Sequence, residues 1–162
     1  AIAFLHKSRM EWNKQAEKVF VGTKQSVSIP KNSRDSHSQE VNVCYGYPLV
    51  ARRAAKQLEI KKADRLTNLK CTKEELELRL EDPKKKKKDR TKLTVETADF
   101  HRYFRPGFCV TLYQAQGATL DKPYTILDWY ARNKRTGELH MGPRERYVAV
   151  SRAVKLKNVA VA

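Results

Sequence analysis

Two short segments near the carboxyl end carry the residues best suited to chemistry. The first reads TLYQAQGAT over residues 111–119, and the second reads YVAVSRA over residues 147–153. Hydroxyl, amide and guanidinium groups of these kinds bind phosphate oxygens, and a tyrosine ring can stack on an unpaired base. The two segments together predict a surface that meets a nucleoside triphosphate and a nucleic-acid strand.

Arg152 is the candidate for direct contact with a transferring phosphoryl group. Its planar guanidinium holds a fixed charge and can grip two phosphate oxygens, and an arginine in that position supplies a large factor in rate. The spacing predicts a helix over 143–153 on which Arg144, Val148 and Arg152 share one face. The alternative is an amphipathic core helix whose arginines face solvent.

The first segment follows the apolar run 108–112, which suits a buried strand, and open α/β sheets bind ligands just beyond their strand ends. Gly117 lets the backbone approach a ligand, and Gln116 offers both a donor and an acceptor. Thr111 has a hydroxyl for a phosphate oxygen, while Tyr113 can stack on a base. The alternative is a strand, a turn and a buried tyrosine.

The elements around these segments predict the α/β fold class. Buried strands that alternate with helices indicate a parallel sheet flanked by helices. The expected strands are 2–5, 108–112, 124–127 and 158–162, and the expected helices are 9–20 and 143–153.

The middle of the chain has a different character and predicts a β-rich insertion over 40–97. Short apolar runs at 41–43, 49–51, 66–69 and 76–80 read as strands. The run of five lysines in the loop 83–90 suits a solvated loop tip, a phosphate-contacting loop or an import signal.

Net charge and cysteine usage restrict the partners and the compartment. Lys and Arg number 34 against 18 Asp and Glu, a net charge of +16, so nucleic acid is the first candidate partner and an anionic membrane surface the second. No apolar stretch is long enough to span a membrane. Of the two candidate partners, we expect nucleic acid and not a membrane. Cys44, Cys71 and Cys109 are widely spaced, which favours a reducing intracellular compartment and predicts no metal site.

The two segments resemble motifs of a known family. The first is similar to the fifth motif of superfamily 1 helicases, T-x-H-x-x-Q-G-x-T, and the second to the sixth, Y-V-A-x-[ST]-R-A. The similarity is to the RecD-like branch, which includes helicases of large DNA viruses. The opening strand and helix at 2–13 resemble the start of its second RecA-like domain, and 46–50 resembles the start of its inserted β-barrel.

The resemblance implies the roles of individual residues and the domain arrangement. Residues 1–39 and 98–162 would form a discontinuous RecA-like domain, interrupted by the barrel-like insertion 40–97. Arg152 would be the arginine finger. Gln116 and Gly117 would lie at the nucleotide cleft. Thr111 and Tyr113 would lie beside the bound strand, with Lys7 as a further candidate for contact with nucleic acid. Tyr113 stands where the family usually has histidine, which preserves stacking but loses a histidine-specific hydrogen bond.

The resemblance also implies partners that this chain does not contain. No G-x-x-x-x-G-K-[ST] segment occurs, so ATP and Mg²⁺ would be bound by a first RecA-like domain of the same polypeptide. The chain lacks an initiator Met, and we expect it to begin inside a longer protein. Alone it is expected not to hydrolyse ATP. The expected ligand is single-stranded nucleic acid, with DNA favoured, and the expected location is the nucleus, the cytoplasm or a viral replication site.

Two other functions fit parts of the sequence. A basic nucleic-acid-binding module without enzymatic activity would show the same salt-sensitive binding. A tyrosine recombinase would use His140, Arg144 and Tyr147, but these lie too close together in the chain to surround a phosphate.

Overall fold

The computed structural model describes residues 1–82, 85–115, 120 and 122–162. The chain forms two compact units. The first comprises Ala1–Trp12 and Cys109–Ala162, and the second comprises Asn13–Phe108. No helix in the described ranges is long and apolar enough to cross a membrane.

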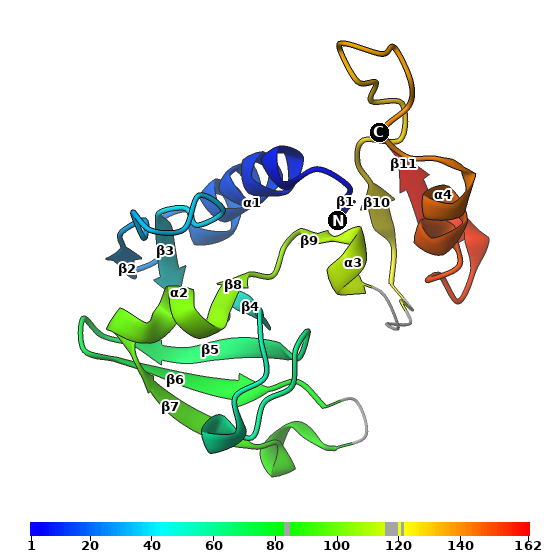
Figure 1. Cartoon of the computed structure of the whole chain (residues 1–162). Coiled ribbons are helices and arrows are strands. Elements are labelled where there is room, and N and C mark those ends of the chain that lie inside the picture. The colour runs from blue at the N-terminus through cyan, green and yellow to red at the C-terminus, as the bar shows by residue number, and fades with distance from the viewer. Residues whose placement is uncertain (83–84, 116–119, 121) are drawn as a thin grey trace. The chain divides into compact units, whose positions relative to one another are not determined.

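The first unit contains a four-stranded sheet whose strands are all parallel (Figure 1). Its order is β11 (Val159–Val161), β10 (Tyr124–Ile126), β1 (Ile2–Ala3) and β9 (Val110–Thr111). Of the two central strands, β1 is buried at both its residues, Ile2 and Ala3, and β10 is buried at Ile126. This sheet confirms the expected α/β class, and it joins the beginning of the chain to its carboxyl end.

The helices of this unit lie between the sheet strands in the chain or directly after them. They are the first part of α1 (His6–Val21), α3 (Leu112–Ala115), α4 (Pro143–Val150) and the single turn η4 (Leu156–Asn158). Pro143 occupies the first turn of α4, where its missing N–H costs no hydrogen bond.

The second unit is mostly antiparallel sheet. A five-stranded sheet has the order β7 (Lys92–Glu96), β6 (Glu75–Leu80), β5 (Arg65–Cys71), β4 (Pro48–Ala51) and β8 (Phe104–Pro106). A separate two-stranded sheet pairs β2 (Ser26–Ile29) with β3 (Val41–Cys44). The remaining elements are the later part of α1, α2 (Phe100–Tyr103), and the turns η1 (Lys56–Leu58), η2 (Lys87–Asp89) and η3 (Thr97–Asp99).

One apolar core holds the second unit together. Leu49, Leu66, Leu76 and Phe100 are almost completely buried in it. Gly107 lies at the end of β8, where an added Cβ would come within 3.2 Å of the Leu49 backbone, so only glycine fits without displacement.

The bounds of the compact units differ from the expected domain bounds. The expected domains were 1–39 with 98–162 and an insertion at 40–97, whereas the units divide within α1 and after β8. A compact unit is defined by packing and a domain by its evolutionary and functional identity, so the domain assignment stays a prediction. The helix expected over 143–153 ends earlier, at Val150.

Candidate nucleotide and nucleic-acid interface

The carboxyl edge of the parallel sheet gathers polar residues from three strands. Thr111 ends β9, Lys7 lies in the first turn of α1 just after β1, and Asp128 follows β10. Ligands of open α/β sheets bind outside this edge, where loops and helix starts meet. Thr111 and Lys7 therefore lie at the edge of the sheet where folds of this kind bind their ligands.

Lys7 and Tyr113 present their side chains to solvent. Tyr113 is 69% exposed on α3, although tyrosine is a large and mostly apolar side chain. Its ring is therefore accessible for stacking. The alternative, in which this tyrosine is buried, does not agree with the exposure. Lys7 is exposed as well, so its ammonium group is accessible to an anion.

Thr111 is buried and its hydroxyl is engaged locally. The Gln114 N–H donates to the Thr111 hydroxyl at 3.3 Å, and the Thr111 N–H donates to Gln114 Oε1 at 3.1 Å. These bonds close the first turn of α3 and position Tyr113 between the two residues. A phosphate contact by this hydroxyl would have to replace the bond to Gln114.

Gln116 and Gly117 lie outside the described residues. The described residue that follows them, Leu120, is bonded to the second segment by its backbone. Its N–H donates to the Arg152 carbonyl at 2.7 Å, and its carbonyl accepts from the Val154 N–H at 3.0 Å. The chain that leaves the glutamine–glycine segment is therefore joined directly to the stretch that carries Arg152.

Arg152 lies beyond the end of α4 rather than on its face. Helix α4 ends because its last carbonyls find partners other than the next turn of helix. Arg152 Nε donates to the Val148 carbonyl at 3.2 Å, and the Tyr124 hydroxyl donates to the Ala149 carbonyl at 2.7 Å. The shared helix face expected for Arg144, Val148 and Arg152 is consequently wrong, although the guanidinium is still anchored one turn back.

The Arg152 guanidinium is partly exposed and lacks an acidic partner. Its Nη2 donates to the Ser151 hydroxyl at 3.0 Å, and no carboxylate among the described residues lies within ion-pair distance. Burial raises the pKa of Tyr124, while the nearby Arg152 charge lowers it. An anion approaching this surface would meet a cation that no described carboxylate neutralises.

Asp128 is the residue of this edge that sequence reasoning missed. Its Oδ2 accepts from the N–H groups of Phe4 and Leu5 at 3.0 and 2.9 Å, and its Oδ1 accepts from the Ser8 hydroxyl at 2.5 Å. Its backbone has a φ of 66°, a left-handed conformation that aspartate tolerates better than most residues. The sequence offers no local signal for this role because the partners lie 120 or more positions away.

A basic side chain also fixes the start of the segment after Asp128. Arg146 Nη2 donates to the Trp129 carbonyl at 2.7 Å, and its guanidinium lies 4.8 Å from the centre of the Trp129 ring.

In the parts of the chain that are described, no group of three His, Cys, Asp or Glu side chains is placed to hold a metal ion.

No protein-family model matches the sequence, and no curated protein matches it. Solved structures do match. A structure of two coordinating Pif1 helicases, described with DNA unwinding at forked double-stranded DNA, has a TM-score of 0.69 at 12% identity, covering 99% of this chain and 38% of that one. Bacteroides Pif1 bound to single-stranded DNA gives 0.65 at 13% identity, with 99% and 39% covered. Bacteroides Pif1 with ADP-AlF3 and single-stranded DNA gives 0.63 at 15% identity, also with 99% and 39% covered.

At these identities the likeness concerns the fold. It extends over nearly the whole chain, so both compact units and their order in the sequence are included. The chain spans about two fifths of the length of the Pif1 helicases it matches. The fold is thus a mixed α/β arrangement, with a parallel sheet and flanking helices, that also occurs within Pif1 helicases.

Proposed function

We propose that this chain is the carboxyl-terminal portion of an ATP-dependent nucleic-acid helicase or translocase of superfamily 1. It would supply an arginine finger and part of the surface that binds the single strand. The observation that carries the proposal is the likeness of fold to Pif1 helicases over 99% of the chain. The two motif-like segments support it, because they lie in the compact unit that contains the parallel sheet.

The arginine-finger role rests on the surroundings of Arg152. The side chain is partly exposed, has no carboxylate partner in the described part of the chain, and lies in a stretch bonded to Leu120. A related Pif1 structure is described with ADP-AlF4, which supports nucleotide use by a longer protein. ATP and Mg²⁺ would be held mainly by a nucleotide-binding domain absent from this sequence, and Arg152 would add positive charge at the terminal phosphate.

The strand-binding role rests on the exposed ring of Tyr113 and on the cation Lys7. Both lie at the carboxyl edge of the sheet, and related Pif1 structures are described with single-stranded DNA. We further propose the RecD-like branch, with similarity to viral helicases, and an intracellular reducing location in the nucleus, the cytoplasm or a viral replication site. These finer assignments rest on the motifs and on the three cysteines, none of which forms a disulfide in the described part of the chain.

A second candidate function is a basic nucleic-acid-binding module without catalytic activity. The net charge of +16 favours it. The hydrogen bond from Arg152 Nε to the Val148 carbonyl favours it as well, because it engages the guanidinium within the chain. Both functions require nucleic-acid binding, but only the helicase portion requires Arg152 during hydrolysis.

Binding by the purified chain tests the strand surface. We expect single-stranded DNA to bind more tightly than duplex, and Tyr113→Ala to lose about 1–3 kcal/mol of stacking. Tyr45→Ala is the matched control, because Tyr45 is 72% exposed and Tyr113 is 69% exposed. Fluorescence anisotropy with a labelled oligonucleotide provides the measurement. Equal affinity for both DNA forms, unchanged by Tyr113→Ala, would remove Tyr113 from the strand path.

A further inference from the structure

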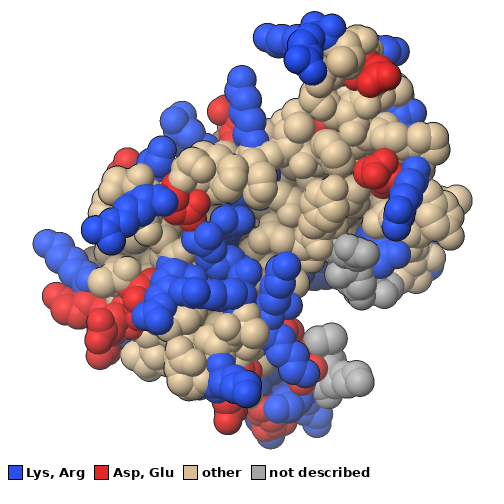
Figure 2. Space-filling model, viewed as in Figure 1, with Lys and Arg blue, Asp and Glu red and all other residues tan. Residues whose placement is uncertain are grey.

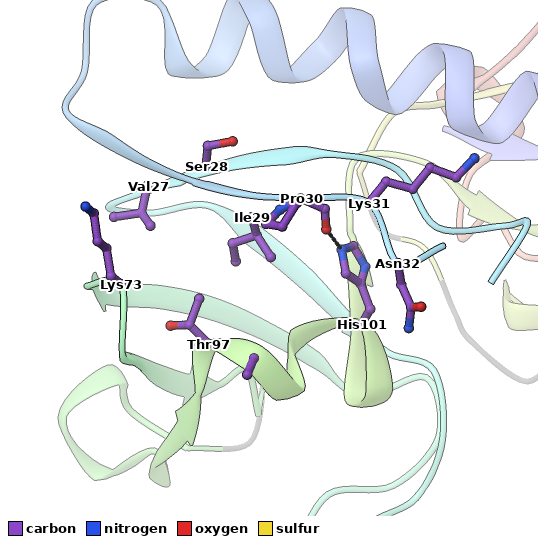
Figure 3. Close-up of a pocket in the computed structure, with 10 residues that line it drawn as sticks. Val27, Ser28, Ile29, Pro30, Lys31, Asn32, Lys73, Thr97 and His101 are labelled. Carbon is purple, nitrogen blue, oxygen red and sulfur yellow. Dashed lines mark hydrogen bonds between the residues drawn. The ribbon is translucent and has the colours of Figure 1, made fainter. Parts of the chain in front are cut away.

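Two adjoining hollows lie in the second unit, which contains none of the residues proposed for the helicase function. The first, which we call the apolar hollow, has a volume of about 460 Å³ and is lined in part by Val27, Ile29, Pro30 and Ala98 (Figure 3). The second, the arginine hollow, has a volume of about 560 Å³. Asn32 and His101 line both, so the two hollows share a wall.

The arginine hollow contains far more positive than negative charge. Its charged lining consists of Arg34, Arg52, Arg53, Arg102 and Asp35. Asp35 is already engaged, since Arg52 Nη1 lies 2.6 Å from its Oδ2 and a fifth arginine, Arg105, lies 3.8 Å from the same oxygen. One carboxylate therefore faces several guanidinium groups, an arrangement that favours an anionic ligand.

Two of these arginines keep their charge without an acidic partner. Among the described residues, neither Arg34 nor Arg53 has a carboxylate within ion-pair distance, and both are exposed. By contrast, Arg102 lies 3.7 Å from Asp99. Arg34 and Arg53 are thus the cations most accessible to a phosphate.

Tyr103 holds part of this cationic surface in place. Arg53 lies 5.5 Å from the centre of the Tyr103 ring and Arg102 lies 5.1 Å from it, while Arg53 Nε donates to the Arg102 carbonyl at 3.1 Å. Tyr103 itself is buried. A guanidinium fixed in this way loses less conformational freedom when it binds a planar or tetrahedral anion.

The apolar hollow differs because its wall is largely uncharged. His101 Nε2 lies 2.8 Å from the Pro30 carbonyl, so this nitrogen carries the proton and donates it (Figure 3). Burial lowers the pKa of His101, which favours the neutral imidazole. Asn32 adds an amide where the two hollows meet; its Oδ1 accepts from the Arg34 N–H at 3.0 Å, and its NH₂ group can donate to the edge of a base.

We propose that the two hollows together bind one nucleotide of a nucleic-acid strand. The arginine hollow would take the phosphate and the apolar hollow would take the base, with Asn32 between them. Their volumes fall within the range of about 300–1,000 Å³ that small-molecule sites occupy. This inference extends the proposed function, since it adds a strand contact on the β-rich unit to those on the parallel sheet.

The phosphate contact is tested by the double variant Arg34→Ala/Arg53→Ala. We expect about tenfold weaker binding of an oligothymidylate, and a salt dependence that is shallower by about one to two released counterions. Lys61→Ala/Lys62→Ala is the control, because both lysines are exposed and line neither hollow. The control variant loses the same two positive charges as the arginine variant. Equal losses in the two double variants would overturn the proposal, because they would reflect net charge alone.

The base contact is tested with an abasic oligomer of the same length and with Ala98→Glu. Ala98 is exposed in the apolar hollow, so the new carboxylate should disfavour the strand without disturbing the core. We expect the native chain to prefer the oligothymidylate to the abasic oligomer, and Ala98→Glu to reduce that preference severalfold. A preference unchanged by Ala98→Glu would contradict the base contact.

These measurements separate the inference from the proposed function. Loss of binding in the arginine variant with no effect of Tyr113→Ala would support the hollows and count against the strand surface on the parallel sheet. The reverse pattern would reject the hollows and leave that surface in place. Circular dichroism melting of each variant would show whether the fold is intact.

Discussion

The Asp128 carboxylate joins the two stretches of chain that make up the first unit. Three donors from the beginning of the chain converge on it, two from the Phe4 and Leu5 backbone and one from the Ser8 hydroxyl. Phe4 and Leu5 immediately precede α1 and Ser8 lies in its first turn, where a nearby carboxylate is favourable. Asp128 therefore anchors the start of α1, and with it Lys7, to the carboxyl edge of the sheet.

Replacing Asp128 by alanine should lower the free energy of unfolding by about 1.5–3 kcal/mol, the range for hydrogen bonds to charged groups. Urea unfolding followed by circular dichroism would measure the loss. Glu138→Ala is the control, because Glu138 is an exposed carboxylate in the following segment. Equal stabilities for the two variants would show that the carboxylate does not anchor the helix.

Asp35 makes the stability of the second unit depend on pH in the acid range. Burial raises the pKa of this carboxyl, but the His37 N–H and Arg52 together hold the pKa below its ordinary value. A depressed pKa means that the contribution to stability is complete above about pH 4 and is lost as the pH falls.

Asp35→Asn should therefore cost more stability near neutral pH than in acid. We expect the difference in free energy of unfolding between native and variant chains to shrink from about pH 6 to about pH 3. Urea titrations at the two pH values provide the measurement. A difference that is constant with pH would mean that the carboxylate is not stabilised by its neighbours.

At the scale of elements, the end of α4 determines where Arg152 lies. A continuing helix would have used the Ala149 carbonyl, but the Tyr124 hydroxyl takes it at 2.7 Å. Strand β10 is therefore bonded to the last turn of α4, just before the Ala153 N–H donates to the Val150 carbonyl instead of continuing the helix.

Tyr124→Phe removes only that hydroxyl donor and should cost about 0.5–1.5 kcal/mol in free energy of unfolding. Tyr147→Phe is the control, because Tyr147 is 74% exposed. Chemical denaturation compares the two. A larger loss in Tyr147→Phe than in Tyr124→Phe would contradict the assignment of Tyr124 as the residue that ends the helix.

The sequence predicted the elements whose patterns are strongly apolar. The runs around Ile2, Val110, Ile126 and Val159 became the four parallel strands of one sheet, in the order β11, β10, β1 and β9. Strands β2 and β7 were not predicted, since serine, lysine and threonine dominate their exposed positions. The end of α4 was misplaced because it depends on Tyr124, which the helix's own sequence does not reveal.

The roles of the candidate site residues stay predictions, and the structure gives the setting of those that it describes. The exposure of Tyr113 agrees with the expected stacking surface, while Thr111 is buried and bonded to Gln114. The convergence of donors on Asp128 required the fold, since contacts across 120 and more positions leave no local pattern. The arginine hollow was likewise not predicted, because its residues come from separate parts of the chain.

At the scale of the whole molecule, charge is the dominant property. Lys and Arg side chains are spread over the visible face, with Asp and Glu among them (Figure 2). A net charge of +16 predicts that affinity for nucleic acid falls steeply as salt rises. Anisotropy titrations over a salt series would measure the slope, and affinity independent of salt would contradict an electrostatic interface.

The central claim concerns Arg152 in a polypeptide that also carries a G-x-x-x-x-G-K-[ST] segment. DNA-stimulated ATP hydrolysis by that polypeptide is the most direct measurement. We predict that Arg152→Ala lowers the turnover rate by about 10³–10⁵-fold, while Arg144→Ala, on the preceding helix, has little effect. Undiminished hydrolysis in Arg152→Ala, or hydrolysis by the present chain alone that Arg152→Ala abolishes, would contradict the account.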